Sequence, residues 1–293
     1  MKLPAPDFDL ALTLDSGQTF HWESLGAGFL GAIGERAVYV EQRGDVLEVR
    51  GGETPSPAGG TPTLPEIVAR YFSLDHPLRE ICAAFPADPA MQGAANFCRG
   101  LRIIRQPRWE CLASFITSSM KQVAHIRQIS LTLRQRFGEA KSLGEKIVHV
   151  YPTPARIAAL RENDLRECAL GYRAKNLLAT AQLIAAGQVD LDQLAGLPDY
   201  ELRTRLCALP GVGTKVANCV MLFAYERLRA FPIDVWVERV LLQRYFPRRR
   251  KMAAGKLRDF AAKHFGAQGG YAQQYLFHHA RKTMPRRLSP RSR

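Results

Sequence analysis

The stretch LPGVGTKVANCVMLFAYERLRAFPIDVWVERV, residues 209–240, decides the fold. A helix is predicted to end near Cys207, because Pro210 cannot continue it, and Gly211 and Gly213 permit a tight turn with positive φ. A second helix follows the turn. Two helices joined in this way present backbone N–H groups at the N-terminus of the second one. These groups form a binding site for an anion, and phosphate suits it.

Two charged side chains in this stretch can carry chemistry. Lys215 lies in the first turn of the second helix, which is predicted to start near Thr214. The helix dipole opposes a cation there and so favours the neutral, nucleophilic amine. Asp234 follows Pro232 and precedes an apolar stretch, so it is predicted to cap the next helix. A solvated or phosphate-binding lysine and a purely structural cap are the alternatives that these residues alone leave open.

The rest of the chain divides into a strand-like and a helix-like region. Apolar and polar residues alternate between residues 10 and 50, whereas apolar residues recur at helical spacing after about residue 65. Between them, the segment GGETPSPAGGTPTL (51–64) is predicted to be a linker or loop. The alternating residues are Phe20, Trp22, Val38, Val40, Leu47 and Val49, with turns at Gly26, Gly28, Gly31 and Gly34; the periodic residues are Ile103, Cys111, Leu112, Phe115, Ile116, Leu177, Leu178, Ala181, Ile184, Val216, Cys219, Val220 and Phe223.

We therefore predict an α+β protein that is mostly α-helical. Its parts are a small N-terminal antiparallel sheet domain (1–85), a helical region (86–280) and a basic, Pro-interrupted tail (281–293) that adds phosphate attraction. The chain has 293 residues and a net charge of +14, from 41 Lys and Arg against 27 Asp and Glu. Such a protein attracts polyanions, and nucleic acid is the leading candidate; a basic protein of the ribosome or of a membrane surface is the alternative.

Cysteine usage and hydropathy restrict the class further. No two cysteines form a CxxC pair, and most lie in apolar runs, so they are predicted to be small buried hydrophobes in a reducing compartment. The sequence contains no run of 18 apolar residues, so no membrane-spanning helix is predicted, and the N-terminus lacks the pattern of a signal peptide. We expect a cytoplasmic protein, or a nuclear one in a eukaryote. The cysteines are Cys82, Cys98, Cys111, Cys168, Cys207 and Cys219.

The 209–240 stretch resembles the helix–hairpin–helix superfamily of DNA glycosylases, and within it the 8-oxoguanine DNA glycosylase family. Its hairpin of the form LPGVGxKxA is followed about twenty residues later by an aspartate after proline, which is the family hallmark. The resemblance extends over essentially the whole chain in matching order. It implies a two-lobed helical glycosylase fold with the small N-terminal sheet domain. Its further segments are SGQTFHW (16–22), GLRIIRQPRWECLASFITSS (100–119), LGYRAK (170–175) and YAQQYLF (271–277).

The resemblance implies a role for each matching residue. Lys215 matches the lysine that attacks C1′ of the sugar, and Asp234 the carboxylate that stabilises the positively charged sugar. The substrate pocket would comprise Gly17, whose carbonyl accepts a hydrogen from N7 of the oxidised base, together with Gln273 and Phe277, which read and stack on the base. Cys219 and Pro232 would belong to the same pocket. The DNA-binding residues would be Gly211, Val212 and Gly213 of the hairpin, Tyr172 and Arg173, which fill the gap left by the flipped base and read the opposite strand, and Met120 and His125.

This chain also departs from the family pattern. Met120-Lys121-Gln122 stands where members carry asparagines that contact the orphan cytosine, His125 stands in place of an arginine, and Trp236 in place of a histidine. These departures concern selectivity for the opposite base and one phosphate contact. No cysteine follows Cys219, so the four-cysteine iron–sulfur site of other superfamily members cannot form. No metal or cofactor is expected for the chemistry.

The resemblance implies a bifunctional DNA glycosylase and AP lyase that excises 8-oxoguanine from double-stranded DNA and acts as a monomer. Two alternatives remain open. One is a non-catalytic helix–hairpin–helix DNA-binding protein, and the other is a monofunctional alkylpurine glycosylase on the same fold. Lys215 argues against both, since neither needs an amine at that position.

Overall fold

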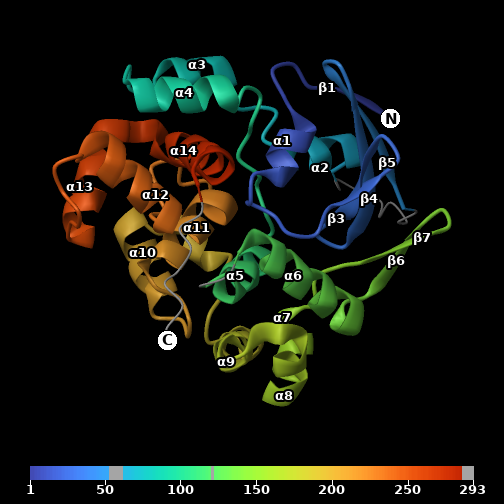
Figure 1. The fold of residues 1–293 in the computed structure, drawn as a ribbon. Helices are drawn as coiled ribbons and strands as arrows, with labels where there is room; N and C mark the ends of the chain where they lie inside the picture. Colours follow the sequence, from blue (N-terminus) through green and yellow to red (C-terminus); the bar gives the residue numbers. More distant parts are fainter. Residues whose placement is uncertain (53–61, 120–121, 286–293) are drawn as a thin grey trace.

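The computed structural model describes residues 1–52, 62–119 and 122–285 (Figure 1). A small sheet lies on one side of a larger helical region, as the residue pattern predicted. The predicted linker falls largely on residues 53–61, and Met120 and Lys121 also lie outside the described residues.

The N-terminal sheet is antiparallel throughout, with strand order β1-β5-β4-β3-β2. Val38 and Val40 of β4 and Leu47 and Val49 of β5 turn their side chains into a core that helix α2 covers, which confirms the predicted alternation. The bounds are β1 Lys2–Pro4, β2 Glu23–Leu25, β3 Gly28–Ile33, β4 Arg36–Arg43, β5 Val46–Gly51 and α2 Leu64–Tyr71.

Two predictions for this domain were wrong. Helix α1 (Leu10–Asp15) occupies the start of the region predicted as strand, because Asp9 caps it, with Oδ1 accepting from the N–H of Leu12 at 2.8 Å. Phe20 and Trp22 then lie in the irregular segment that follows α1. Gly28 and Gly31 lie within β3 and not in turns. A Cβ at Gly31 would stand 2.7 Å from the Trp22 ring, so this glycine allows the ring to pack against the strand.

The helical region is built on one large core shared by all of its major helices. Helices α5 to α9 form one lobe and α10 to α14 the other, with α5 packed on α11 between them (Figure 1). The bounds are α3 Leu78–Ala83, α4 Pro89–Phe97, α5 Arg108–Thr117, α6 Val123–Phe137, α7 Pro154–Ala158, α8 Glu162–Leu165, η1 Arg166–Leu170, α9 Arg173–Ala185, η2 Gln193–Gly196, α10 Asp199–Cys207, α11 Thr214–Tyr225, α12 Val235–Val240, η3 Leu241–Tyr245, α13 Ala254–Phe265, η4 Gly266–Gln268 and α14 Gly269–Thr283.

The helical periodicity was confirmed in α5, α9 and α11, but not at Ile103, which lies in an extended segment before Arg108 starts α5. A hairpin of β6 (Ala140–Leu143) and β7 (Lys146–His149) packs against the N-terminal sheet and was not predicted. Helix α14 continues to Thr283, so the first three residues of the segment assigned to the tail are helical. All six cysteines are free, and Cys207 is exposed where a buried position was expected.

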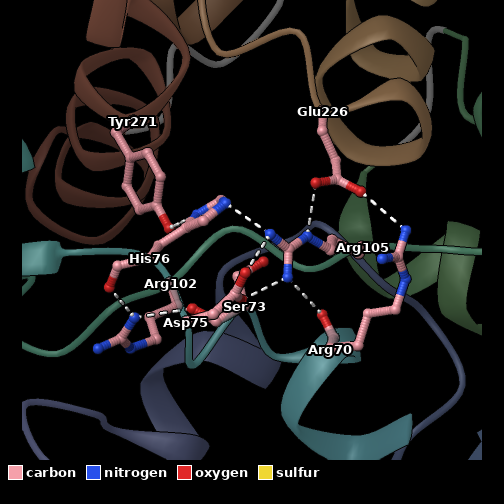
Figure 2. A network of polar contacts seen from close by, with 8 residues as sticks. All are labelled: Arg70, Ser73, Asp75, His76, Arg102, Arg105, Glu226 and Tyr271. Atoms are coloured by element: carbon pink, nitrogen blue, oxygen red, sulfur yellow. Dashed lines mark hydrogen bonds and ion pairs between the residues drawn. The ribbon is translucent and has the colours of Figure 1, made fainter. Parts of the chain in front are cut away.

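A polar network joins the N-terminal domain to helices α11 and α14 (Figure 2). Arg105 pairs with Glu226 at the end of α11, Nε to Oε2 at 2.8 Å, and donates from Nη2 to Asp75 Oδ2 at 2.9 Å. It also contacts His76 Nε2 at 2.9 Å. Because an arginine can only donate, this nitrogen accepts, and His76 Nδ1–H donates to the hydroxyl of Tyr271 on α14 at 2.8 Å.

The imidazole of His76 is therefore neutral in this arrangement. Burial, and next the charge of Arg105, lower the pKa of His76 below its ordinary value. The network fixes the C-terminal end of α11 and the N-terminal half of α14 to the same loop after α2 (Figure 2).

Candidate active site

The hairpin between α10 and α11 has the predicted positive φ at Gly211 but not at Gly213, whose φ is −91° in an extended conformation. Gly211 has φ +80°, and a Cβ there would stand 2.8 Å from the Cβ of Asn176 on α9. Thr180 of α9 donates to the carbonyl of Pro210 at 3.0 Å, which holds the turn in place. The side chain of Val212 is buried, while Gly213 is exposed as the N-cap of α11. The hairpin therefore offers backbone groups, not side chains, to an anion.

Lys215 lies in the first turn of α11, half-buried against aromatic residues. Its Nζ stands 5.2 Å from the centroid of the Phe115 ring, which in turn stacks on Phe223 at 5.5 Å. Cys219 is buried one turn further along α11. Burial raises the pKa of the Cys219 thiol to about 11, although the charge of Lys215 opposes the shift. Cys219 is thus a neutral thiol beside the amine at physiological pH.

Asp234 caps α12 as predicted and also lies near Lys215. Its Oδ1 accepts from the N–H groups of Trp236 at 3.0 Å and Val237 at 2.9 Å. Burial raises the pKa of the Asp234 carboxyl, while the Val237 bond and the charge of Lys215 pull it down. Both capping bonds end on one oxygen, so the cap does not use Oδ2. Pro232, two residues earlier, is buried.

Gly17 and Phe277 meet although they are far apart in sequence. Gly17 has φ +83°, and a Cβ there would stand 3.1 Å from Cε1 of Phe277. Any side chain at this position would therefore strain the turn and crowd the ring. The backbone of Gly17 therefore lies close to the Phe277 ring, which brings together two of the residues predicted to bind the base.

Gln273 stands one turn before Phe277 on α14, and its side chain is 4% exposed. Its Oε1 is buried and has no hydrogen-bond partner among the described residues. A buried amide oxygen without a partner is costly, by about 1–3 kcal/mol. Such an atom is explained if a ligand donates to it, and the edge of a purine can do so.

Other predicted DNA-binding residues lie in the other lobe. Tyr172 precedes α9 and is 59% exposed, and His125 is exposed in the first turn of α6. Arg173, in contrast, is buried: Nε donates to the carbonyl of Ser119 at 2.7 Å and Nη1 to that of Leu170 at 3.2 Å. Its guanidinium also covers the Tyr172 ring at 4.4 Å. Arg173 thus holds the residue before Met120, itself outside the described residues.

Sequence reasoning missed the residues that support the Gly17 turn. Gln18 is fully buried, and its side chain donates to the carbonyl of Arg102 at 2.8 Å and accepts from the N–H of Ile104 at 2.9 Å. Gln106 donates to the carbonyl of Gln18 at 2.8 Å. Neither Gln18 nor Gln106 gives a signal of such a role in the sequence, because the partners of these side chains are about 85 residues away.

Comparison with known proteins assigns the chain to a family. Residues 113–263 match the model of the HhH-GPD superfamily base excision DNA repair proteins, and residues 1–112 match the 8-oxoguanine DNA glycosylase N-terminal domain. The chain therefore belongs to the HhH-GPD superfamily of base excision DNA repair proteins. Within it, the N-terminal match places the chain with the 8-oxoguanine DNA glycosylases.

Relatives match over nearly the full length. An 8-oxoguanine glycosylase/lyase of Clostridium acetobutylicum, solved with double-stranded DNA containing cytosine opposite 8-oxoguanine, is 30% identical with a TM-score of 0.86, covering 96% of this chain and 97% of that one. A probable N-glycosylase/DNA lyase of Methanothermobacter thermautotrophicus is 28% identical over 97% and 96% of the two chains. An N-glycosylase/DNA lyase of Arabidopsis thaliana is 29% identical over 94% and 78%. Among the described helices, none has the length and apolarity to cross a membrane.

Proposed function

We propose that this protein is a bifunctional DNA glycosylase and AP lyase that removes 8-oxoguanine from double-stranded DNA, with Lys215 as nucleophile. The observation that carries the proposal is that the predicted site residues form two groups in the structure. Lys215 lies beside Cys219 and near Asp234, and the backbone of Gly17 lies close to Phe277. The first group would supply the chemistry and the second would bind the base. The family membership and the relatives described above support the same activity.

The reaction requires the damaged nucleotide to leave the stack, because C1′ is inaccessible inside the duplex. The backbone N–H groups of the hairpin and the basic surface hold the phosphates, and the exposed Tyr172 enters the gap that the flipped base leaves. The base then lies on Phe277, its N7–H donates to the carbonyl of Gly17, and its edge donates to the unpartnered Oε1 of Gln273.

The chemical step uses the amine of Lys215. Its lone pair forms a bond to C1′ while the bond from C1′ to N9 of the base breaks, and the base leaves with the electron pair and takes up a proton. The ionised Asp234 stabilises the positive charge that develops on the sugar. The nitrogen of the C1′ adduct loses a proton and the C1′–O4′ bond breaks, with O4′ taking up a proton, so that the sugar ring opens and an imine forms. The imine then loses a proton from C2′, and the bond from C3′ to the phosphate oxygen breaks, so that the 3′ phosphate leaves and the strand is nicked.

Borohydride trapping tests this proposal. The protein is incubated with duplexes carrying 8-oxoguanine, alkylated bases or uracil, with and without borohydride. We expect base release and a covalent complex only with 8-oxoguanine. Release of alkylated bases without trapping would favour the monofunctional alkylpurine glycosylase, and binding without release would favour the non-catalytic DNA-binding protein. We also expect the protein to act as a monomer, in the nucleoid of a bacterium or the nucleus of a eukaryote.

A further inference from the structure

Side chains of helix α14 donate hydrogen bonds to two consecutive carbonyl groups of the turn that leads into Gly17. Arg281 donates from Nη2 to the carbonyl of Asp15, and Gln274 donates from Nε2 to the carbonyl of Ser16 at 2.9 Å. Gln274 is fully buried. Because peptide units are planar, fixing these carbonyls fixes the direction in which the chain enters Gly17. On the far side, Gln106 donates to the carbonyl of Gln18 at 2.8 Å, so the chain is held both before and after Gly17 while the carbonyl of Gly17 itself is not used by these contacts.

Arg281 is held on several sides. It pairs with the carboxylate of Asp15 at 3.5 Å, and its Nη2 contacts Nδ1 of His278 at 3.1 Å. Burial lowers the pKa of His278 to about 4, so that nitrogen keeps a lone pair for Arg281 at neutral pH. The guanidinium also lies over the Phe277 ring, 5.9 Å from its centroid. The Arg281 side chain is only 15% exposed.

The spacing of these residues links them to base reading. Gln273, Phe277 and Arg281 follow one another at intervals of four, so they form one stripe along α14. Gln274 and Arg281 are seven apart, which brings them to a common face two turns apart. One helix therefore carries the two predicted base readers and also the anchors of the Gly17 turn.

We propose that Arg281 and Gln274 are positioning residues that set the gap between the Gly17 carbonyl and the Phe277 ring, and so select a purine with a hydrogen on N7. This inference rests on the proposed function. A rigid gap matters because guanine and 8-oxoguanine have the same size at the stacking face, so only a carbonyl held at the N7 edge distinguishes them. Guanine presents an acceptor there, and a turn free to move away would tolerate it.

The test uses the full chain and matched variants. Arg281→Met and Gln274→Met keep an unbranched stem and remove the donors, Arg281→Lys keeps the charge, and Lys282→Met is the control. Lys282 is 43% exposed and contacts only the carboxylate of Asp15, at 2.6 Å, among the contacts described. The measurements are single-turnover release of 8-oxoguanine and cleavage of a preformed abasic site. In a Lys215→Gln background, affinities are measured for duplexes with 8-oxoguanine, guanine and an abasic analogue.

We expect Arg281→Met and Gln274→Met to lower release of 8-oxoguanine about tenfold or more, since a hydrogen bond involving a charged or buried group is lost. Cleavage of the abasic site should stay within about threefold, because it needs no base. The ratio of affinities for 8-oxoguanine over guanine should fall about tenfold, with partial recovery in Arg281→Lys and no change in Lys282→Met. Thermal unfolding checks that each variant is folded.

Two results would overturn the inference while leaving the proposed function intact. One is release of 8-oxoguanine by Arg281→Met and Gln274→Met at the wild-type rate. The other is an equal loss on 8-oxoguanine and abasic substrates, which would indicate general loosening of the fold. If the wild type itself releases no 8-oxoguanine and forms no trapped complex, the proposed function fails and this inference with it.

Discussion

Replacing Asp234 separates its capping role from its chemical role. Asp234→Asn keeps an oxygen that can accept from the N–H groups of Trp236 and Val237, and asparagine caps helices as well as aspartate does. Asp234→Ala removes the cap. We expect the alanine variant to lose about 1 kcal/mol of unfolding free energy, and the asparagine variant to unfold like the wild type.

The loss of activity should be large and common to both variants. Removing a group aimed at charge that develops in the transition state costs about 2.7–4 kcal/mol, which is about 10² to 10³ in rate. We therefore expect both variants to release 8-oxoguanine about a hundredfold to a thousandfold more slowly in single-turnover assays. Thermal unfolding measures the stability difference on the same preparations.

The pH profile gives a second readout. Burial raises the pKa of the Asp234 carboxyl, and the ionised form is the active one, so the wild-type rate should fall with decreasing pH from above the ordinary carboxyl range. This acid limb should be missing in Asp234→Asn. A rate for Asp234→Asn within about threefold of the wild type, together with an intact acid limb, would refute a chemical role and leave Asp234 as a cap only.

Three further predictions test the other parts of the site. Lys215→Gln should keep DNA binding and lose both base release and borohydride trapping, and trapping at the wild-type level would remove Lys215 from the mechanism. Gln273→Ala and Phe277→Ala should weaken discrimination of the oxidised base but leave affinity for abasic-site DNA nearly intact; equal losses on both ligands would mean that these residues only pack. Excision opposite cytosine should exceed excision opposite other bases by about tenfold or less, since Met120 cannot pair with a base edge and Arg173 is engaged by protein carbonyls. Single-turnover rates on four duplexes that differ in the opposite base measure this preference, and one of about a thousandfold would contradict the reasoning.

The parts of the fold that follow from local rules could be predicted from the sequence. The hairpin, the start of α11 at Thr214 and the cap at Asp234 each depend on residues within one or two turns. The helix α1 was missed because its signal is a single capping aspartate, Asp9, before a short apolar run. The hairpin of β6 and β7 was missed because it forms against the N-terminal sheet, which is a tertiary contact.

The same contrast between local signals and long-range contacts applies to the site. The resemblance indicated Gly17, Gln273 and Phe277, but spacing along the chain cannot show that Gly17 and Phe277 touch. The supporting residues could not be found at all, because Gln274 and Arg281 act on carbonyls more than 250 positions away. A glutamine and an arginine on a helix near a chain end are ordinarily surface residues, and only the packed structure shows one of them fully buried.

Two separate sets of contacts hold the parts of the proposed site. One sets the distance between helices α11 and α14, and the other sets the distance between α14 and the turn before Gly17. Arg105 and its partners fix the far end of α11 and the near end of α14 to one loop, so they set how the helix of Lys215 lies relative to the helix of Gln273. A change at Arg105 would move both helices and so affect the attack on C1′ in every substrate, with or without a base. Arg281, in contrast, connects the turn before Gly17 to α14. If Arg281 is the positioning residue proposed above, we expect its effect to reach the sugar only through the base, so that variants of Arg281 should alter base selection without altering strand cleavage.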